Sequence, residues 1–171
     1  MLSFDNNKYL LLAIANCGLM TDHIAKKHFS TNNNEVENLI SNNLIERSGV
    51  YLIYGKSTCI YTLTDATKEM FNQLGKSLYK SDTTQLEHDY ILLKVYSTID
   101  KLSQESWQNE SELKSIYRKN TCDGVFKFND KLIGVEIITK SYTKIAINEK
   151  MSFINQFCDD FISLNTSDIK I

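Results

Sequence analysis

Residues 21–63 read TDHIAKKHFSTNNNEVENLISNNLIERSGVYLIYGKSTCIYTL, and this stretch decides which fold the N-terminal half can adopt. Thr21 is a suitable N-cap for a short helix over residues 22–29. Asn32, followed three positions later by a glutamate, predicts a capping box that opens a second helix over residues 32–43. Two consecutive helices joined by a short turn are therefore expected here.

A β-hairpin is expected directly after these helices. The runs Val50–Tyr54 and Cys59–Leu63 are rich in β-branched and aromatic residues, which favours strands. The segment Gly55-Lys56-Ser57-Thr58 joins them and offers a glycine for a left-handed turn position. The order helix, turn, helix, hairpin is typical of a winged helix-turn-helix, a fold that places one helix in the DNA major groove.

Further helices are predicted on both sides of this stretch. Phe4–Asn16 carries an apolar face, and Gly18 supplies a C-terminal stop. Thr64 is the expected N-cap of a closing helix that ends at Gly75. We therefore predict that residues 1–78 form a winged helix-turn-helix DNA-binding domain.

Basic and amide side chains supply the candidate DNA contacts of this domain. Asparagine can bond bidentately to adenine in the major groove, and a lysine at a hairpin tip suits a phosphate. The alternative is that the asparagines only reflect compositional bias on a solvated face, and it stays open. The candidates are Lys26, Lys27, Asn33, Asn34, Asn38, Arg47 and Lys56.

Composition restricts the classes of function. The 171 residues are 42% hydrophobic and contain no long apolar run, so no membrane partner is expected. The N-terminus lacks a basic signal-peptide region, which predicts a cytoplasmic protein. Net charge is −2; residues 1–80 have 8 basic and 7 acidic residues, whereas residues 81–171 have 11 and 14. DNA contacts must therefore come from local patches.

No cofactor or metal is expected from the cysteines, which do not have the spacing of a zinc or redox motif. Free thiols in a reducing compartment are the simpler interpretation. The four cysteines are Cys17, Cys59, Cys122 and Cys158.

The C-terminal half, residues 84–171, is predicted to form a small α/β domain after a polar boundary at residues 76–84. Its order of elements is α, β, β, α, β, so this half is α+β or α/β, and the whole chain is expected to be α+β. The expected elements are a helix over Leu86–Leu102, strands over Cys122–Phe128 and Leu132–Thr139 around an Asn129-Asp130 turn, a helix over Ala146–Phe157 and a strand over Phe161–Leu164.

Two carboxylates lie near the predicted strand hairpin. Asp123 opens one strand and Glu136 lies in the next, which is the arrangement by which nucleases hold Mg²⁺. A restriction-endonuclease-like site has a lysine two residues after the glutamate, and Ile138 stands there instead. Lys140 is two residues further, on the same strand face by parity.

Short motifs of both halves resemble the replication-relaxation family. That resemblance implies a winged helix followed by a degenerate nuclease-like domain, in a protein of a plasmid or other mobile element. Ile138 departs from the second acidic position of the family's strand motif. The motifs are Leu86-Glu87-His88-Asp89, Trp107 with Glu110, Glu112 and Leu113, Asp123-Gly124-Val125-Phe126, Gly134-Val135-Glu136 and Lys140-Ser141.

Together these patterns favour a sequence-specific double-stranded DNA-binding regulator that acts in transcription, replication or conjugal transfer. The C-terminal domain is expected to lack a full active site and to mediate dimerisation or docking of a relaxase or replication protein. One alternative is a Mg²⁺-dependent nuclease that uses Asp123, Glu136 and Lys140. Another is a winged-helix protein-interaction module that does not bind DNA.

Overall fold

The structure is a computed structural model that describes residues 4–168; the side chains of residues 4–6, including Phe4, are not described. Residues 1–3 and 169–171, at the ends of the two expected domains, lie outside it. The chain is α+β and divides into two compact units, Met1–Ile99 and Asp100–Ile171.

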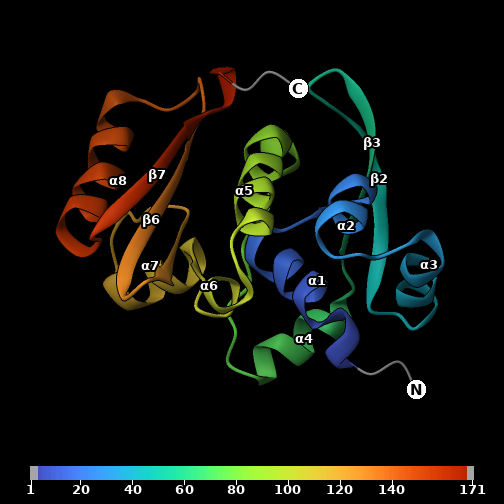
Figure 1. The fold of residues 1–171 in the computed structure, drawn as a ribbon. Helices are drawn as coiled ribbons and strands as arrows, with labels where there is room; N and C mark the ends of the chain where they lie inside the picture. Colours follow the sequence, from blue (N-terminus) through green and yellow to red (C-terminus); the bar gives the residue numbers. More distant parts are fainter. Residues whose placement is uncertain (1–3, 169–171) are drawn as a thin grey trace. The chain divides into compact units, whose positions relative to one another are not determined.

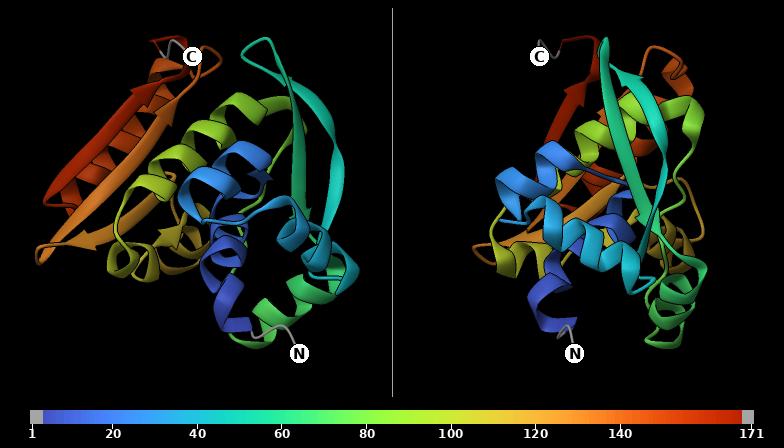
Figure 2. Two further views of the ribbon diagram at one scale, coloured as in Figure 1. Left: turned by 45° about the vertical axis from the view of Figure 1, so that its right-hand side comes forward. Right: turned by 90° about the vertical axis from the view of Figure 1, so that its right-hand side faces the viewer.

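Unit 1 consists of helices around a three-stranded antiparallel sheet of order β1-β3-β2. Figure 1 shows the β2–β3 hairpin beside α2 and α3, and both views of Figure 2 show its tip projecting past these two helices. The elements are α1 (Phe4–Cys17), β1 (Met20–Thr21), α2 (Asp22–His28), α3 (Asn33–Ser41), β2 (Ile45–Ile53), β3 (Lys56–Leu63), α4 (Asp65–Gln73), the 3-10 turn Thr83–Gln85 and α5 (Leu86–Thr98).

The predicted helix starts are confirmed, because local side chains satisfy the free backbone N–H groups. The Thr21 hydroxyl accepts from the N–H of Ile24 at 3.3 Å. Asn32 and Glu35 form the complete capping box at the start of α3. The Thr64 hydroxyl caps α4 in the same way.

The hairpin differs from the expectation in its turn. Tyr54 and Gly55 have φ values of 48° and 74°, so these two residues alone make the turn. Lys56 is therefore the first residue of β3, paired with Ile53, and does not lie in a four-residue loop. Arg47 lies inside the longer β2, beside a bulge, and not before the strand.

The boundary between the units also differs, because α5 belongs to unit 1 and not to the C-terminal half. Tyr96 of α5 is fully buried, and its hydroxyl accepts from the Asn16 amide of α1 at 3.4 Å. The polar segment before α5 packs as well: the hydroxyls of Ser81 and Tyr79 donate to the Asp89 carboxylate at 2.5 and 3.0 Å. The segment predicted as a linker is thus tied by hydrogen bonds to Asp89, a buried residue of unit 1.

Unit 2 is a four-stranded mixed sheet of order β4-β5-β6-β7, in which β7 alone runs parallel to its neighbour. Helix α8 makes the crossover from β6 to β7 and lies against these strands in Figures 1 and 2. The elements are α6 (Lys101–Glu105), β4 (Gln108–Asn109), α7 (Glu110–Tyr117), β5 (Gly124–Phe128), β6 (Lys131–Ile138), α8 (Lys144–Phe157), β7 (Asp160–Asn165) and the 3-10 turn Thr166–Asp168.

The turn between β5 and β6 agrees with the sequence prediction, whereas the helix that joins the two units does not. Asn129 and Asp130 make the turn between β5 and β6 with φ values of 48° and 62°, as predicted. The prediction of a single helix over Leu86–Leu102 is wrong. Helix α5 ends at Thr98, and the side chain of Asp100 caps the separate helix α6.

Tight packing fixes the start of β5, where the acidic residues lie. Trp107 is buried and stacks on Phe126 with ring centroids 5.8 Å apart. A Cβ atom at Gly124 would lie 2.3 Å from the Trp107 ring, so only glycine fits there. Phe153 and Ile154 of α8 pack into the same unit's core and hold this helix against the sheet.

None of the helices within residues 4–168 combines the length and the apolar character needed to cross a bilayer.

Candidate functional site

Helix α3 presents amide side chains on its exposed face. Val36 and Leu39 are buried on the core side, whereas Asn33, Asn34 and Asn38 are exposed. Primary amides carry both a donor and an acceptor, which is what contact with a base edge requires. The three asparagines are therefore open to solvent on α3.

Both acidic side chains of α3 are engaged within the protein. The Glu35 carboxylate accepts from the backbone N–H of Asn32 at 2.7 Å. Glu37 forms an ion pair with Arg47 of β2. Because each carboxylate already has a donor, the negative charge of α3 is partly compensated and the amides dominate its exposed face.

The Glu37–Arg47 pair is one end of a polar chain that joins α3 to the sheet. A hydrogen bond that the Arg47 guanidinium donates to Tyr61, followed by the charge of Glu37, raises the pKa of Arg47. The Tyr61 hydroxyl in turn donates to Asp22 at 2.7 Å. These four residues, with Asn33 and Val36, line a hollow of about 410 Å³. The sequence predicts Arg47 as a contact residue but gives no indication of its acidic partner, which lies ten residues earlier on another element.

The remaining basic candidates are exposed side chains of unit 1. Lys26 and Lys27 lie in the last turn of α2, where positive charge is favourable. Lys56 is exposed next to the hairpin turn, at the end that projects past α2 and α3 (Figure 2). Positive charge therefore comes from both the helices and the hairpin.

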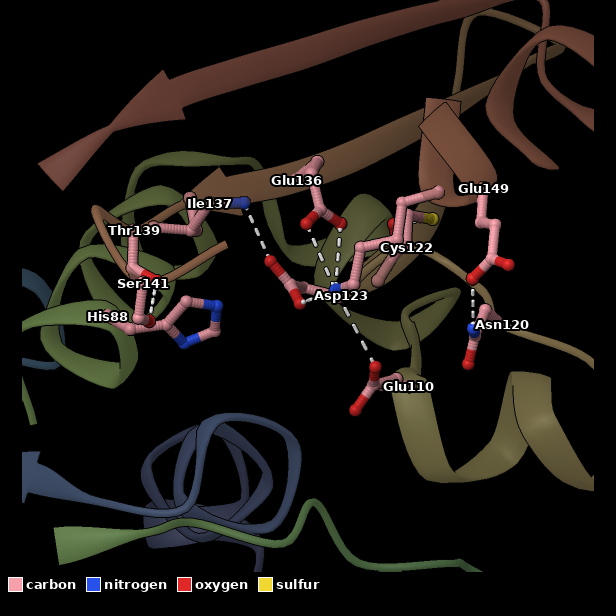
Figure 3. Close-up of polar contacts among 12 residues, drawn as sticks. His88, Glu110, Asn120, Cys122, Asp123, Glu136, Ile137, Thr139, Ser141 and Glu149 are labelled. Carbon is pink, nitrogen blue, oxygen red and sulfur yellow. Dashed lines mark hydrogen bonds and ion pairs between the residues drawn. The ribbon is translucent and has the colours of Figure 1, made fainter. Parts of the chain in front are cut away.

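In unit 2, three carboxylates from separate elements converge on one nitrogen. We call Glu110 of α7, Asp123 before β5 and Glu136 of β6 the acidic cluster. All three contact the Nζ atom of Lys150 on α8, and Figure 3 draws these ion pairs as dashed lines from the labelled carboxylates. Asp123 and Glu136 are candidates predicted from the sequence, whereas Lys150 is not.

The contacts of Lys150 are short and largely shielded from water. Its Nζ atom lies 2.9 Å from Asp123 Oδ1, 3.0 and 3.2 Å from the Glu136 oxygens, and 3.6 Å from Glu110 Oε1. Asp123 and Glu136 are each 1% exposed. The Lys150 side chain is 11% exposed. The ammonium is thus the cation of this site.

Backbone geometry fixes one of the two buried carboxylates, that of Asp123. The N–H of Asp123 donates to the carbonyl of Val135 at 3.0 Å, which extends the β5–β6 ladder by one residue. The other oxygen of Asp123 accepts from the N–H of Ile137 at 2.6 Å. Asp123 therefore faces β6 whether or not a cation is present.

Electrostatics keeps Lys150 charged. Burial of the ammonium acts to lower the pKa of Lys150, but the charges of Asp123 and Glu136 outweigh it and raise that pKa above its ordinary value. The ring of Tyr142 lies 5.1 Å from Nζ, and burial raises the pKa of its phenol to about 12. At neutral pH, Tyr142 is therefore uncharged and Lys150 is an ammonium.

The structure places Lys140 differently from the expectation. Strand β6 ends at Ile138, so Lys140 is an exposed residue of the following turn and not part of the strand face. Lys150 supplies the cation instead. Its sequence signal is a lone lysine on the apolar stripe of α8, between Ile147 and Ile154 at helical spacing.

Carboxylate oxygens are the ligands that Mg²⁺ prefers, so the acidic cluster has suitable donor atoms. However, an ammonium occupies the point where these oxygens meet, and among residues 4–168 no group of three or more His, Cys, Asp or Glu side chains is arranged to hold a metal ion. The residues present do not fit a metal while Lys150 remains in place.

No protein-family model, no curated protein and no solved structure matches this chain.

Lys150→Met should destabilise unit 2 by about 3–5 kcal/mol, because it leaves buried carboxylates without their cation. Urea denaturation can be followed by the fluorescence of Trp107, the only tryptophan, which lies in the same unit. Lys144→Met, at an exposed position on the same helix, is the matched control and should change stability by less than about 0.5 kcal/mol. Equal midpoints for Lys150→Met and the wild type would contradict the assignment.

The effect of Lys150→Met should stay constant from pH 7 to pH 9. A lysine whose pKa is raised by folding contributes fully below its unfolded pKa of about 10.4, and loses this contribution only above it. The same denaturation series at several pH values checks this, and a difference that shrinks before pH 9 would contradict it.

Proposed function

We propose that this chain is a sequence-specific double-stranded DNA-binding protein with a winged-helix unit 1 and a non-hydrolytic, nuclease-like unit 2. The observation that carries the proposal is the exposed face of α3. Both of its carboxylates bond within the protein, so the exposed asparagine amides are free to dominate contact with bases.

The arrangement of unit 1 supports this function. The order α1-β1-α2-α3-β2-β3 with a sheet of order β1-β3-β2 is the pattern of a winged helix. In helix-turn-helix proteins the second helix of the motif reads the major groove, which assigns that role to α3. Lys26, Lys27 and Lys56 then supply phosphate contacts from the helix and hairpin sides, and Arg47 adds another if it leaves Glu37.

The arrangement of unit 2 supports a nuclease-like fold. The resemblance to the replication-relaxation family is supported by a hairpin, a crossover helix and a parallel fourth strand, with one carboxylate just before β5, at Asp123, and one in β6, at Glu136. With Lys150 in the acidic cluster, this unit serves as a dimerisation or docking module. A relaxase or replication protein of a mobile element is the partner that the resemblance implies.

A Mg²⁺-dependent nuclease is the second candidate, since the acidic cluster brings three carboxylates to one point. The ammonium at that point argues against it. A protein-interaction module is the third, favoured by the apolar side chains of Val50 and Leu52, which are 68% and 71% exposed on one face of the hairpin.

Unit 1 should bind duplex DNA. A plot of the logarithm of the association constant against the logarithm of the salt concentration should have a slope of about −3 to −4, as expected for three or four phosphate contacts. Gel-shift titrations of the full chain against random and upstream DNA, at two or more salt concentrations, measure this slope. No binding even at low salt would reject DNA binding and favour the protein-interaction module.

Asn34→Ala should reduce discrimination between preferred and random sequences, whereas Lys56→Ala should weaken both alike. A lost base contact costs about 1–3 kcal/mol on the preferred site only, but a lost phosphate contact is independent of sequence. Sites selected from a random duplex pool provide the comparison. If both variants lower the two affinities in equal proportion, α3 is not the reading element.

The wild-type chain should not cleave DNA, because the cation site is filled and Lys140 lies outside it. Supercoiled plasmid and single-stranded oligonucleotides are incubated with purified protein and Mg²⁺ or Mn²⁺. Cleavage that depends on metal and disappears in Glu136→Ala would instead establish the nuclease.

A further inference from the structure

Two of the four cysteines lie together in unit 2, although they are far apart in the sequence. Cys122 directly precedes the acidic residue Asp123 (Figure 3), and Cys158 is the C-cap residue of α8. Cys122 is buried in the apolar core of the unit, and the half-buried Cys158 packs against the same core. Their side chains are hydrogen-bonded to each other, and both are free thiols. The fold thus brings two reduced sulfur atoms into contact.

The backbone on both sides of Cys158 holds it in this position. Its N–H donates to the carbonyl of Ile154 at 2.8 Å, which completes the last turn of α8. The N–H of the next residue, Asp159, donates to the Leu132 carbonyl of β6, and its carboxylate accepts from the Leu132 N–H, both at 2.8 Å. A Cβ atom at Gly134 would lie 3.1 Å from the Cys158 sulfur, so β6 passes close to this side chain. The Cys158 thiol is therefore held against the sheet.

The two thiols are not equivalent. A thiol has one hydrogen, so the Cys122 S–H can point either to the Gly124 carbonyl, 3.2 Å away, or to the sulfur of Cys158. This hydrogen bond from Cys122 lowers the pKa of Cys158, and the same bond, together with burial, raises the pKa of Cys122. The thiolate is the nucleophile in disulfide exchange, which makes the half-buried Cys158 the attacking thiol and the buried Cys122 the second one.

We propose that Cys122 and Cys158 form a reversible disulfide by exchange with a low-molecular-weight disulfide of the glutathione type. The Cys158 sulfur attacks one sulfur of the small disulfide, whose S–S bond breaks, and the released thiolate takes up the proton that Cys158 loses. The Cys122 thiol then loses its proton and attacks the Cys158 sulfur of this mixed disulfide, which releases the second small thiol. Two protein thiols are thereby oxidised and one small disulfide is reduced to two thiols.

This bond connects the two elements that hold the acidic cluster and its cation. Cys122 is next to Asp123, and Cys158 ends the helix that carries Lys150. From hydrogen-bond contact, the sulfurs need only approach to the S–S bond length of about 2.05 Å. A cross-link between residues far apart in the chain restricts the unfolded state and so stabilises the folded unit. Disulfide formation is confined to unit 2, so it and DNA binding by unit 1 can fail separately.

The test incubates the folded full-length wild type with excess oxidised glutathione, followed by acid quenching, alkylation of free thiols and peptide mass spectrometry. A Cys122–Cys158 link without bound glutathione should form and be removed by dithiothreitol. Thermal unfolding followed by the fluorescence of Trp107 should show a melting temperature of unit 2 that is higher by roughly 5 °C or more in the linked protein. Cys59→Ala, which removes the half-buried thiol of unit 1, is the control and should form the link as the wild type does.

Two variants test the order of attack. In Cys122→Ala, Cys158 should retain glutathione as a mixed disulfide, because no second thiol releases it. In Cys158→Ala, the buried Cys122 should remain a free thiol. Glutathione on Cys122 but not on Cys158 would contradict the assigned roles. Absence of the link in the folded wild type, or a link that forms only when urea is added, would overturn the proposal whether or not the variants fold.

Discussion

A single ammonium group connects the three elements of unit 2 that contribute the acidic cluster. Lys150 of α8 contacts carboxylates from α7, from the residue before β5 and from β6. The contact to β6 crosses between the helix and the sheet, so it adds an electrostatic link to the apolar packing of Phe153 and Ile154. Because Asp123 and Glu136 are buried, loss of the ammonium leaves two neighbouring carboxylates without their cation.

The same type of ion pair has the opposite consequence in unit 1, because it is exposed. The side chains of Arg47 and Glu37 are 50% and 54% exposed, a setting in which ion pairs contribute about 0–1 kcal/mol. Arg47 can therefore exchange Glu37 for a DNA phosphate at little cost in free energy. The buried Lys150 therefore stays with its carboxylates, whereas the exposed Arg47 is available to a ligand.

Features fixed by neighbouring residues could be predicted from the sequence. The N-caps of α2, α3 and α4 and the Asn129-Asp130 turn follow from local side-chain and backbone preferences. The β2–β3 turn was misplaced because Tyr54 adopts a left-handed conformation that a tyrosine rarely takes. The unit boundary was misplaced because the polar Ser81 and Tyr79 find their partner in Asp89 of α5, which composition alone does not reveal.

In the candidate sites, too, residues close together in the sequence could be predicted, whereas residues brought together only by the fold could not. Asp123 and Glu136 were found because their strands are adjacent in sequence, and the hairpin brings them together. Lys150 was missed because it lies 27 residues from Asp123 and 14 from Glu136, on a helix whose position depends on the crossover between β6 and β7. Only the lone lysine on an apolar helix stripe indicated a buried cation.

The central claim, that Lys150 is the resident cation of the acidic cluster, can be tested by observing its ammonium directly. Lysine-selective ¹H–¹⁵N correlation spectra of the wild type detect NH₃⁺ groups that are shielded from exchange with water, and Lys150→Met assigns the signal. The account predicts one protected ammonium resonance at neutral pH that is unchanged by millimolar Mg²⁺. Absence of a protected resonance, or its loss when Mg²⁺ is added, would contradict it.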